Sequence, residues 1–357
     1  MEYVSALDAL IRKNTSLTRL TPDHLHLEFG LFSLVECCPH LRRLALCHEG
    51  EDKVEQSIKM GKILTHAAQT IPLLPALMLR FPQSDSRAIK IQTLFITLLT
   101  QNHAFRQLEV LHMEDTFGCP FSRAHAAFFP SLHTLILRHH SGQVNNNCCF
   151  ELAYFLPGLP ALRVLRLCEA DEKGFYDGMG SSGTCGNWDQ DPNIARITLP
   201  ALEELHMDRA CTKLWVPQLR KLVLHMPLLD DFRCFTHTTK LEEAQIGPIS
   251  CVGSHALVAF AMNTPRMRKI ELTNPREPWL DGLPPHWPLL QSLSLRDVEE
   301  WGATSSRQFM QSFPALRAFE MTVKSVRDDV LVGVSASQPL LRLTDLTSLT
   351  IGYACQV

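Results

Sequence analysis

The sequence contains the stretch Pro160-Ala-Leu162-Arg-Val-Leu165-Arg-Leu167, and copies of this pattern, Pro-x-Leu-x-x-Leu-x-Leu, recur along the 357 residues. Close copies begin at Pro39, Pro130, Pro200, Pro217, Pro265, Pro288 and Pro314. Looser copies, without proline at its usual place, begin near Leu17, Leu74, Leu108, Leu241 and Leu346. Copies at a mean spacing of about 27 residues predict a solenoid, in which each unit buries its apolar face against its neighbours.

The last two leucines of each copy alternate with other residues, which predicts a strand that buries one face. Such strands stack in parallel, so each copy needs a return segment across the other side of the sheet. Residues 91–99 place Ile91, Leu94, Phe95, Leu98 and Leu99 on one face of a helix. We also predict return helices at residues 53–69, 121–129, 148–156, 254–263 and 306–313, and a tight loop between Leu202 and Leu219.

The repeat resembles that of the leucine-rich-repeat family, in particular the irregular, helix-returning repeats of fungal F-box leucine-rich-repeat proteins. The resemblance covers residues 15–357. It implies an α/β, right-handed horseshoe-shaped solenoid of about 12–13 repeats, with parallel strands on the concave face and helices or loops on the convex face. We therefore expect a single domain over residues 1–357. No F-box is recognisable upstream of Leu41, so the chain is a fragment, a divergent relative or a repeat protein without that module.

The resemblance also implies a function. We expect a protein–protein interaction module that binds a protein target on its concave face. F-box relatives suggest a substrate-recognition subunit of a cullin-type ubiquitin ligase, which would contact a ligase adaptor. Two alternatives stay open: a free-standing scaffold or inhibitor without a ligase link, and an enzyme that uses residues 169–199 as a lid. Of these, we favour a binding protein that is not an enzyme.

Composition narrows the classes of partner. The chain has 34 Lys and Arg against 37 Asp and Glu, so a nucleic-acid partner bound by phosphate neutralisation is not expected. With 45% hydrophobic and 20% charged residues, it can bury a large core. No apolar run reaches about 18 residues, so no membrane span is expected. The N-terminus lacks the basic start of a signal peptide, so we expect a cytoplasmic or nuclear monomer with reduced thiols.

Residues that flank the second and third leucines of each repeat should project from the concave face. They carry charges of both signs, with a basic group from Arg138 to Arg166 and an acidic group from Glu204 to Asp208. A solvated sheet face is the simple interpretation for any one of them, whereas the set suits a protein partner. The predicted partner-binding residues are Arg80, His112, Glu114, Arg138, Arg166, Glu204, His206, Asp208, Lys221, His225 and Glu243.

Two long segments interrupt the repeats. Residues 169–199 form a Gly- and Asp-rich insertion, either a contact surface or a tolerated loop. Residues 274–288 form a proline-rich loop with Trp279 and Trp287, which we expect to cover the leucine core rather than to anchor a partner.

Sharper chemical motifs are absent or fail in context. The Gly178-Met-Gly180-Ser-Ser-Gly183 stretch matches a dinucleotide-binding pattern, but it does not directly follow a strand, and no helix start follows it. Cys37, Cys38, His40, Cys47 and His48 could supply zinc donors, but they lack a Cys-x-x-Cys knuckle, and packing as small apolar residues explains the cysteines. We therefore expect no catalytic residue, no cofactor and no metal.

Overall fold

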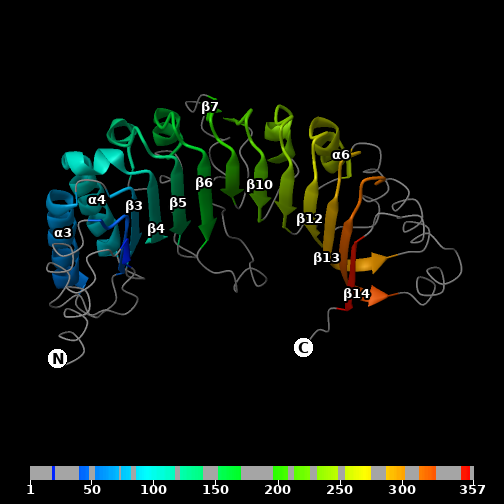
Figure 1. The fold of residues 1–357 in the computed structure, drawn as a ribbon, viewed down its shortest axis with the longest axis horizontal. Coiled ribbons are helices and arrows are strands. Elements are labelled where there is room, and N and C mark those ends of the chain that lie inside the picture. The colour runs from blue at the N-terminus through cyan, green and yellow to red at the C-terminus, as the bar shows by residue number, and fades with distance from the viewer. Residues whose placement is uncertain are drawn as a thin grey trace, which may run out of the picture. The chain divides into compact units, whose positions relative to one another are not determined.

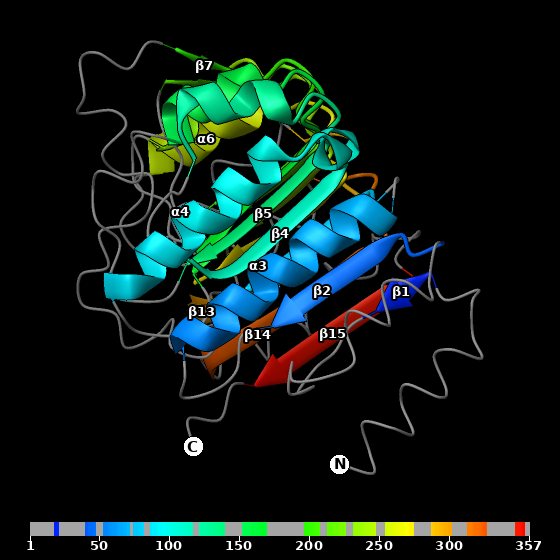
Figure 2. The same cartoon turned by 90° about the vertical axis from the view of Figure 1, so that its left-hand side faces the viewer.

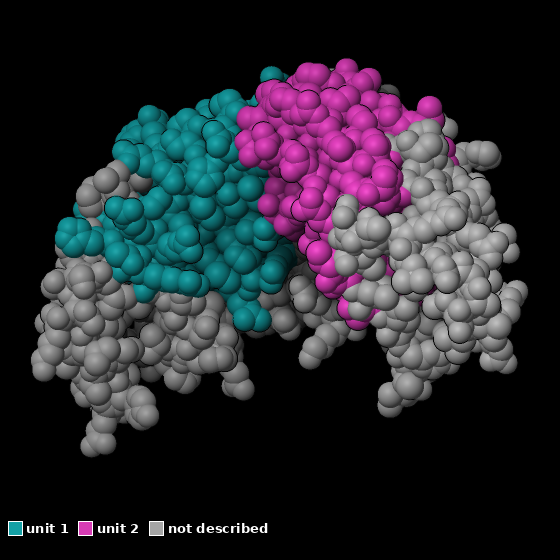
Figure 3. Space-filling view, turned by 45° about the vertical axis from the view of Figure 1, so that its right-hand side comes forward, with its two compact units in different colours: residues 1–187 teal, residues 188–357 magenta. Residues whose placement is uncertain are grey.

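The fold is known from a computed structural model. It describes residues 18–20, 40–47, 53–71, 74–81, 86–116, 121–139, 152–169, 196–207, 213–225, 231–247, 254–274, 287–301, 313–326 and 347–353. The chain divides into two compact units, residues 1–187 (unit 1) and residues 188–357 (unit 2), which Figure 3 colours separately. A single domain over residues 1–357 stays a prediction.

Unit 1 contains a parallel sheet of six strands that follow one another in sequence order (Figure 1). The second leucine of one repeat pairs with the second leucine of the next, as in Leu77 with Leu111 and Leu111 with Leu135. This register places apolar side chains in a continuous buried row. The strands are β1 (Arg19–Leu20), β2 (Arg43–Cys47), β3 (Ala76–Arg80), β4 (Val110–Thr116), β5 (Thr134–His139) and β6 (Val164–Glu169).

Helices cover the buried face of this sheet. In Figure 2, α3 (Lys53–Thr70) and α4 (Ser86–Gln101) lie over the strands β2 to β5. Short 3₁₀ segments follow at η1 (His103–Gln107), η2 (Arg123–Phe128) and η3 (Leu156–Gly158). The predicted return segment at 121–129 is therefore in the right place but is 3₁₀ rather than α-helical. A 3₁₀ segment rises about 2 Å per residue, so a short return can cross the sheet with few residues.

Unit 2 repeats this plan with seven parallel strands. They are β8 (Glu204–Met207), β10 (Lys221–Leu224), β11 (Glu243–Ile246), β12 (Lys269–Thr273), β13 (Ser292–Trp301), β14 (Ala318–Val326) and β15 (Ser348–Tyr353). The described return segments include η4 (Asp231–Phe235) and α6 (Ser254–Asn263). The position of α6 confirms the helix predicted at 254–263. The helix predicted at 306–313 lies outside the described residues except for Phe313.

A second, two-stranded sheet in unit 2 was not predicted. It pairs β7 (Ile197–Thr198) with β9 (Leu214–Trp215) in parallel. The return between Leu202 and Leu219 is short, as predicted, and is too short for a helix. Its backbone groups find partners in β7 instead: Ile197 N donates to Lys213 O at 2.9 Å, and Leu199 N donates to Trp215 O at 3.0 Å.

The prolines of the repeat occupy β-turns that lead into the strands. Leu132 N donates to Phe129 O at 3.2 Å, which closes a four-residue turn with Pro130 in its second position. Leu162 N and Leu159 O close the equivalent turn around Pro160. Proline favours this position because its fixed φ matches the first central residue of such turns. The repeated proline therefore sets the backbone direction before each strand.

Aromatic side chains fill the space between the sheets and the return segments. In unit 1, the rings of Phe121 and Phe155 stack with centroids 4.4 Å apart. In unit 2, Trp287 is fully buried, and its Nε1 donates to Thr264 Oγ1 at 3.0 Å. The expected core position is thus confirmed for Trp287, while Trp279 lies outside the described residues. None of the helices that the structure describes could cross a membrane.

Candidate functional site

In both units, the side chains between the buried leucines project from the face of the sheet opposite the return segments. We call this the open face. In β3, for example, Leu77 and Leu79 are buried, while Met78 is half-buried and Arg80 is exposed. The alternation follows from the two-residue period of a strand. The predicted site residues within the described strands lie on this face.

Four predicted residues meet in unit 1 and form what we call the Glu114 cluster. Glu114 on β4 lies opposite Arg80 of β3 in the register. Arg138 on β5 donates from a guanidinium nitrogen to Glu114 Oε1 at 3.2 Å. Arg80 Nε lies 3.8 Å from Glu114 Oε2, and His112 Nε2 lies 3.2 Å from Glu114 Oε1. One carboxylate therefore lies within 4 Å of nitrogen atoms from three adjacent strands.

This environment favours the ionised form of Glu114. Its side chain is 14% exposed, whereas those of Arg80 and Arg138 are 44% and 45% exposed. Hydrogen bonding with His112 lowers the pKa of Glu114, and the charges of His112, Arg138 and Arg80 lower it further, against a raising effect of burial. The carboxylate is thus held charged in the centre of the cluster, with the two guanidinium groups reaching towards solvent.

Arg166, the fifth predicted residue of unit 1, lies on β6 opposite Ile136 of β5. It is half-buried. Ile136 pairs with Arg166 on one side and with His112 of β4 on the other, so these three residues form a row across the strands, which we call the middle row of the open face. The structure therefore confirms that Arg166 projects from the same face but gives it a different row from Arg80 and Arg138.

A smaller cluster lies on the open face of unit 2. His206 Nε2 is 2.8 Å from Glu204 Oε1 on the same strand, and Lys221 Nζ of β10 is 3.7 Å from that oxygen. Lys221 lies opposite Glu204 on one side and Glu243 on the other. Three predicted residues thus contact one another, and an exposed Glu243 extends the row. Asp208 lies outside the described residues.

His225 follows β10, and its backbone N–H donates to Met207 O at 3.0 Å. Directly beside it, Gly247 follows β11, and its N–H donates to Leu224 O at 2.6 Å. A Cβ at position 247 would lie 1.8 Å from His225 O, so only glycine fits there. His225 therefore stands at a close approach of two backbones.

The set of predicted residues missed a network farther along unit 2. Gln245 donates from Nε2 to Glu271 Oε1 at 3.2 Å, and Arg296 Nε lies 3.1 Å from that same oxygen. Ser294 Oγ donates to Glu320 Oε2 at 3.4 Å. These residues occupy the same outward positions of their repeats as the predicted ones. The repeat pattern could have found them, because it marks every strand alike.

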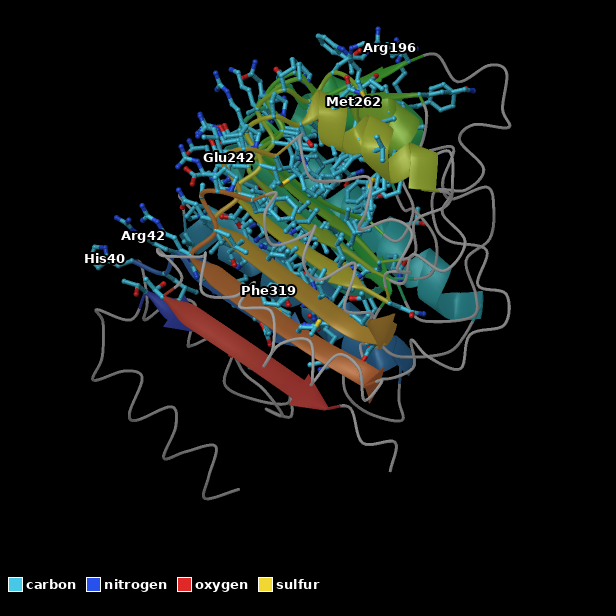
Figure 4. The ribbon with its side chains drawn as sticks, turned by 90° about the vertical axis from the view of Figure 1, so that its right-hand side faces the viewer. His40, Arg42, Arg196, Glu242, Met262 and Phe319 are labelled. Carbon is cyan, nitrogen blue, oxygen red and sulfur yellow. The ribbon has the colours of Figure 1, made fainter. Side chains whose placement is uncertain are left out.

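A further row of charges lies at the edge where strands begin. In unit 1, His40 and Arg42 project away from the ribbon there, and Glu242 does so in unit 2, whereas Phe319 points into the core (Figure 4). Arg220 lies 4.0 Å from Glu242 across neighbouring strands. Backbone hydrogen bonds between neighbouring strands hold the residues of this edge in place; for example, Glu242 N donates to Arg220 O at 2.9 Å.

No protein-family model and no curated protein sequence matches the chain. Its structure resembles a chain of the yeast Rad7–Elc1 complex, with a TM-score of 0.50 and 16% identity, over 97% of this chain and 88% of that one. The chain has the leucine-rich-repeat fold. Each copy of the repeat yields one parallel strand followed or preceded by a return segment, so the predicted α/β fold class is confirmed.

Two further solved structures align along most of the chain at lower similarity. An internalin from Listeria monocytogenes has a TM-score of 0.41 and 12% identity, covering 98% of this chain and 95% of that one. A leucine-rich-repeat protein from Leptospira interrogans has a TM-score of 0.35 and 10% identity, covering 97% and 93%.

Several sequence motifs lie outside the described residues. These include the glycine pattern at 178–183, the pair Cys37–Cys38, and most of the 169–199 insertion. Within the described residues, no group of three or more His, Cys, Asp or Glu side chains could hold a metal ion. The enzyme hypothesis with a 169–199 lid therefore stays a prediction, as does the expectation that no cofactor binds.

Proposed function

We propose that this leucine-rich-repeat chain is a protein-interaction module that holds a protein target on the open face of its sheets. The observation that carries the proposal is the fixed array of charged side chains on that face. In the Glu114 cluster and in the network around Glu271, each carboxylate is bound by side chains of neighbouring strands. Such an array presents charges in set positions, which favours selective recognition of a complementary surface.

The proposed contact residues are those of the two clusters and their neighbours. Binding would be non-covalent, because the open face offers donors, acceptors and half-buried apolar groups. Exposed charges would mainly set encounter rate and selectivity, and buried contacts would supply affinity. The residues are Arg80, His112, Glu114, Arg138 and Arg166 in unit 1, and Glu204, His206, Asp208, Lys221, His225 and Glu243 in unit 2.

The proposal is tested by selecting peptides from a random phage-displayed library on the full-length chain. Selected peptides are then measured against the open-face variants Arg138→Glu and Lys269→Glu. Matched controls are Arg106→Glu in η1 and Arg266→Glu in the turn before β12, both exposed outside the sheets. We expect the open-face variants to weaken binding of most peptides at least fivefold and the controls to leave it unchanged. Binding that responds to neither open-face variant would exclude this surface.

A second proposal concerns assembly. We propose that the chain acts as a substrate-recognition subunit of a cullin-type ubiquitin ligase. Its support is the resemblance of the repeats to F-box leucine-rich-repeat proteins, together with the fold shared with a chain crystallised in the two-protein Rad7–Elc1 complex. We expect the full-length protein to form a stoichiometric complex with a purified cullin adaptor in size-exclusion chromatography. Separate elution of the two proteins at micromolar concentration would exclude this role.

A further inference from the structure

The open face of unit 1 carries an excess of positive charge. Arg19 pairs with Arg43 at the start of β1 and β2, and both are exposed. Three further arginines project from β3, β5 and β6. The described open-face positions of unit 1 thus hold five arginines and one carboxylate, that of Glu114; the arginines are Arg19, Arg43, Arg80, Arg138 and Arg166.

Unit 2 differs in this respect. Its described open-face positions hold carboxylates and cations in nearly equal number, and several of them pair with one another. They are Glu204, Glu243, Glu271 and Glu320 against Lys221, Lys269 and Arg296. Among the described open-face positions, the excess of positive charge therefore belongs to unit 1, although the net charge of the whole chain is −3.

Apolar side chains lie between the arginines of unit 1. Met78 and Ile136 are half-buried in the middle row of the open face, and Val110 and Val164 are half-buried in the row where strands begin. Strands β2 to β6 span about 19 Å, because neighbouring strands lie about 4.8 Å apart. An extended peptide of about six residues covers this width. The surface can therefore take apolar side chains between charged contacts.

We propose that the open face of unit 1 binds an acidic segment of a protein partner, in which carboxylate residues alternate with apolar ones. The inference rests on the proposed function and names the chemistry of its partner. Arginine suits this task because its planar guanidinium presents five donors to carboxylates. The carboxylates would approach Arg43, Arg80 and Arg138, and the apolar residues would cover Met78 and Ile136.

A peptide fits this surface better than a nucleic acid. Glu114 stands ionised among the arginines, so a continuous phosphate backbone would meet a repelling charge in the middle of the basic region. Alternate residues of a peptide strand can instead place an apolar group there. The described open-face residues of unit 1 include no Phe, Tyr or Trp on which bases could stack, a contact that single-stranded nucleic-acid sites commonly use.

The test uses the full-length chain and two fluorescein-labelled peptides of about eight residues. One alternates Glu with Leu, and the other alternates Gln with Leu. By fluorescence anisotropy at low salt, we expect the acidic peptide to bind at least tenfold more tightly. Its affinity should fall as salt rises, because exposed charge pairs are screened. Equal affinities for the two peptides would overturn the inference.

Variants locate the site. We expect Arg80→Gln with Arg138→Gln to weaken binding of the acidic peptide about tenfold, since each lost ion pair is worth up to about fivefold in affinity. The matched control, Arg106→Gln with Arg123→Gln, removes two exposed charges from η1 and η2 and should change affinity less than twofold. Equal effects of the two double variants would overturn the location.

A third variant should increase the affinity for the acidic peptide, a change that a folding defect would not produce. Glu114→Gln removes the carboxylate among the arginines, so the acidic peptide should bind about two- to threefold more tightly. Unchanged or weaker binding by this variant would overturn the inference. The inference would also be overturned if a single-stranded oligonucleotide of equal charge bound more tightly than the acidic peptide at the same salt concentration.

The phage selection separates failure of the inference from failure of the proposed function. If selected peptides depend on open-face residues but show no excess of Asp and Glu, the inference fails while the proposed function stands. If no selected peptide responds to open-face substitution, both fail. Selection of acidic, apolar-interleaved sequences that depend on Arg138 supports both.

Discussion

The contact between Arg138 and Glu114 should stabilise unit 1 by a measurable coupling energy. The two charged atoms lie 3.2 Å apart. At that distance two unit charges attract by about 1.3 kcal/mol in water and about 5 kcal/mol at an effective dielectric constant near 20. The Arg138 side chain is 45% exposed, so solvent screening and lost side-chain freedom bring the net value towards the lower figure. We expect a coupling of about 0.5–1.5 kcal/mol.

A double-mutant cycle measures the coupling energy between Arg138 and Glu114. The four proteins are the natural chain, Arg138→Ala, Glu114→Gln and the double variant, each unfolded in urea at pH 7. All five tryptophans lie at residue 188 or later, so tryptophan fluorescence reports on unit 2. The transition must therefore be followed by far-UV circular dichroism, with amide hydrogen exchange on β4 and β5 as the local measure.

The Arg80–Glu114 pair supplies the internal comparison. Arg80 Nε lies 3.8 Å from Glu114 Oε2, farther than the 3.2 Å between Arg138 and Glu114 Oε1. The same cycle with Arg80→Ala should give a smaller coupling. A coupling below about 0.3 kcal/mol for Arg138, or a larger one for Arg80, would refute the view that Glu114 interacts more strongly with Arg138 than with Arg80.

Three further outcomes follow from the structure. Gly247→Ala should destabilise unit 2 by about 1–3 kcal/mol in urea unfolding, because the new Cβ would overlap the backbone of His225. In Gly61→Ala the new Cβ meets only the flexible end of Leu98 at 3.3 Å, so this variant should be neutral or stabilising by up to about 1 kcal/mol. The folded pKa of Glu114 lies below its ordinary value of 4.5, so the stability that the natural chain gains over Glu114→Gln should be complete above pH 4.5 and lost as pH falls through the folded pKa. An advantage that does not decrease at all as the solution is acidified would contradict this. If residues 1–357 form a single cooperative domain, the urea transition measured by tryptophan fluorescence, which reports on unit 2, should coincide with the transition measured by circular dichroism. Separate midpoints would show two independent units.

The spacing of leucines was sufficient to predict the strands. All thirteen copies, including the degenerate one at Leu17, yield a strand in the expected place. The reason is local: alternation marks a strand, and a unit of this length can bury its leucines only by stacking on its neighbours. The long return helices at residues 53–70 and 86–101 were also predictable, because their apolar residues recur at helical spacing.

The shorter returns were harder to predict. The 3₁₀ segments η1 and η4 and the small sheet of β7 with β9 carry no strong periodic signal, since they contain few residues and are shaped by the backbone partners available. The buried position of Trp287 was expected, because the tryptophans of residues 274–288 were predicted to cover the leucine core. Its hydrogen bond to Thr264 was not, because the two residues stand 23 positions apart and meet only where the ring of Trp287 packs against that of Phe260 in α6.

By itself, the sequence determined the repeated strands, the alternation of buried and outward residues, and hence the set of side chains that the open face presents. Only the tertiary structure decided which of those side chains meet. Glu114 is bound by Arg138 rather than by Arg166 because Glu114 and Arg138 directly follow the paired residues Met113 and Leu137, whereas Arg166 lies opposite Ile136 in the row of His112. Periodicity fixes the direction of a side chain along its own strand, whereas distances between strands depend on register and on returns of unequal length.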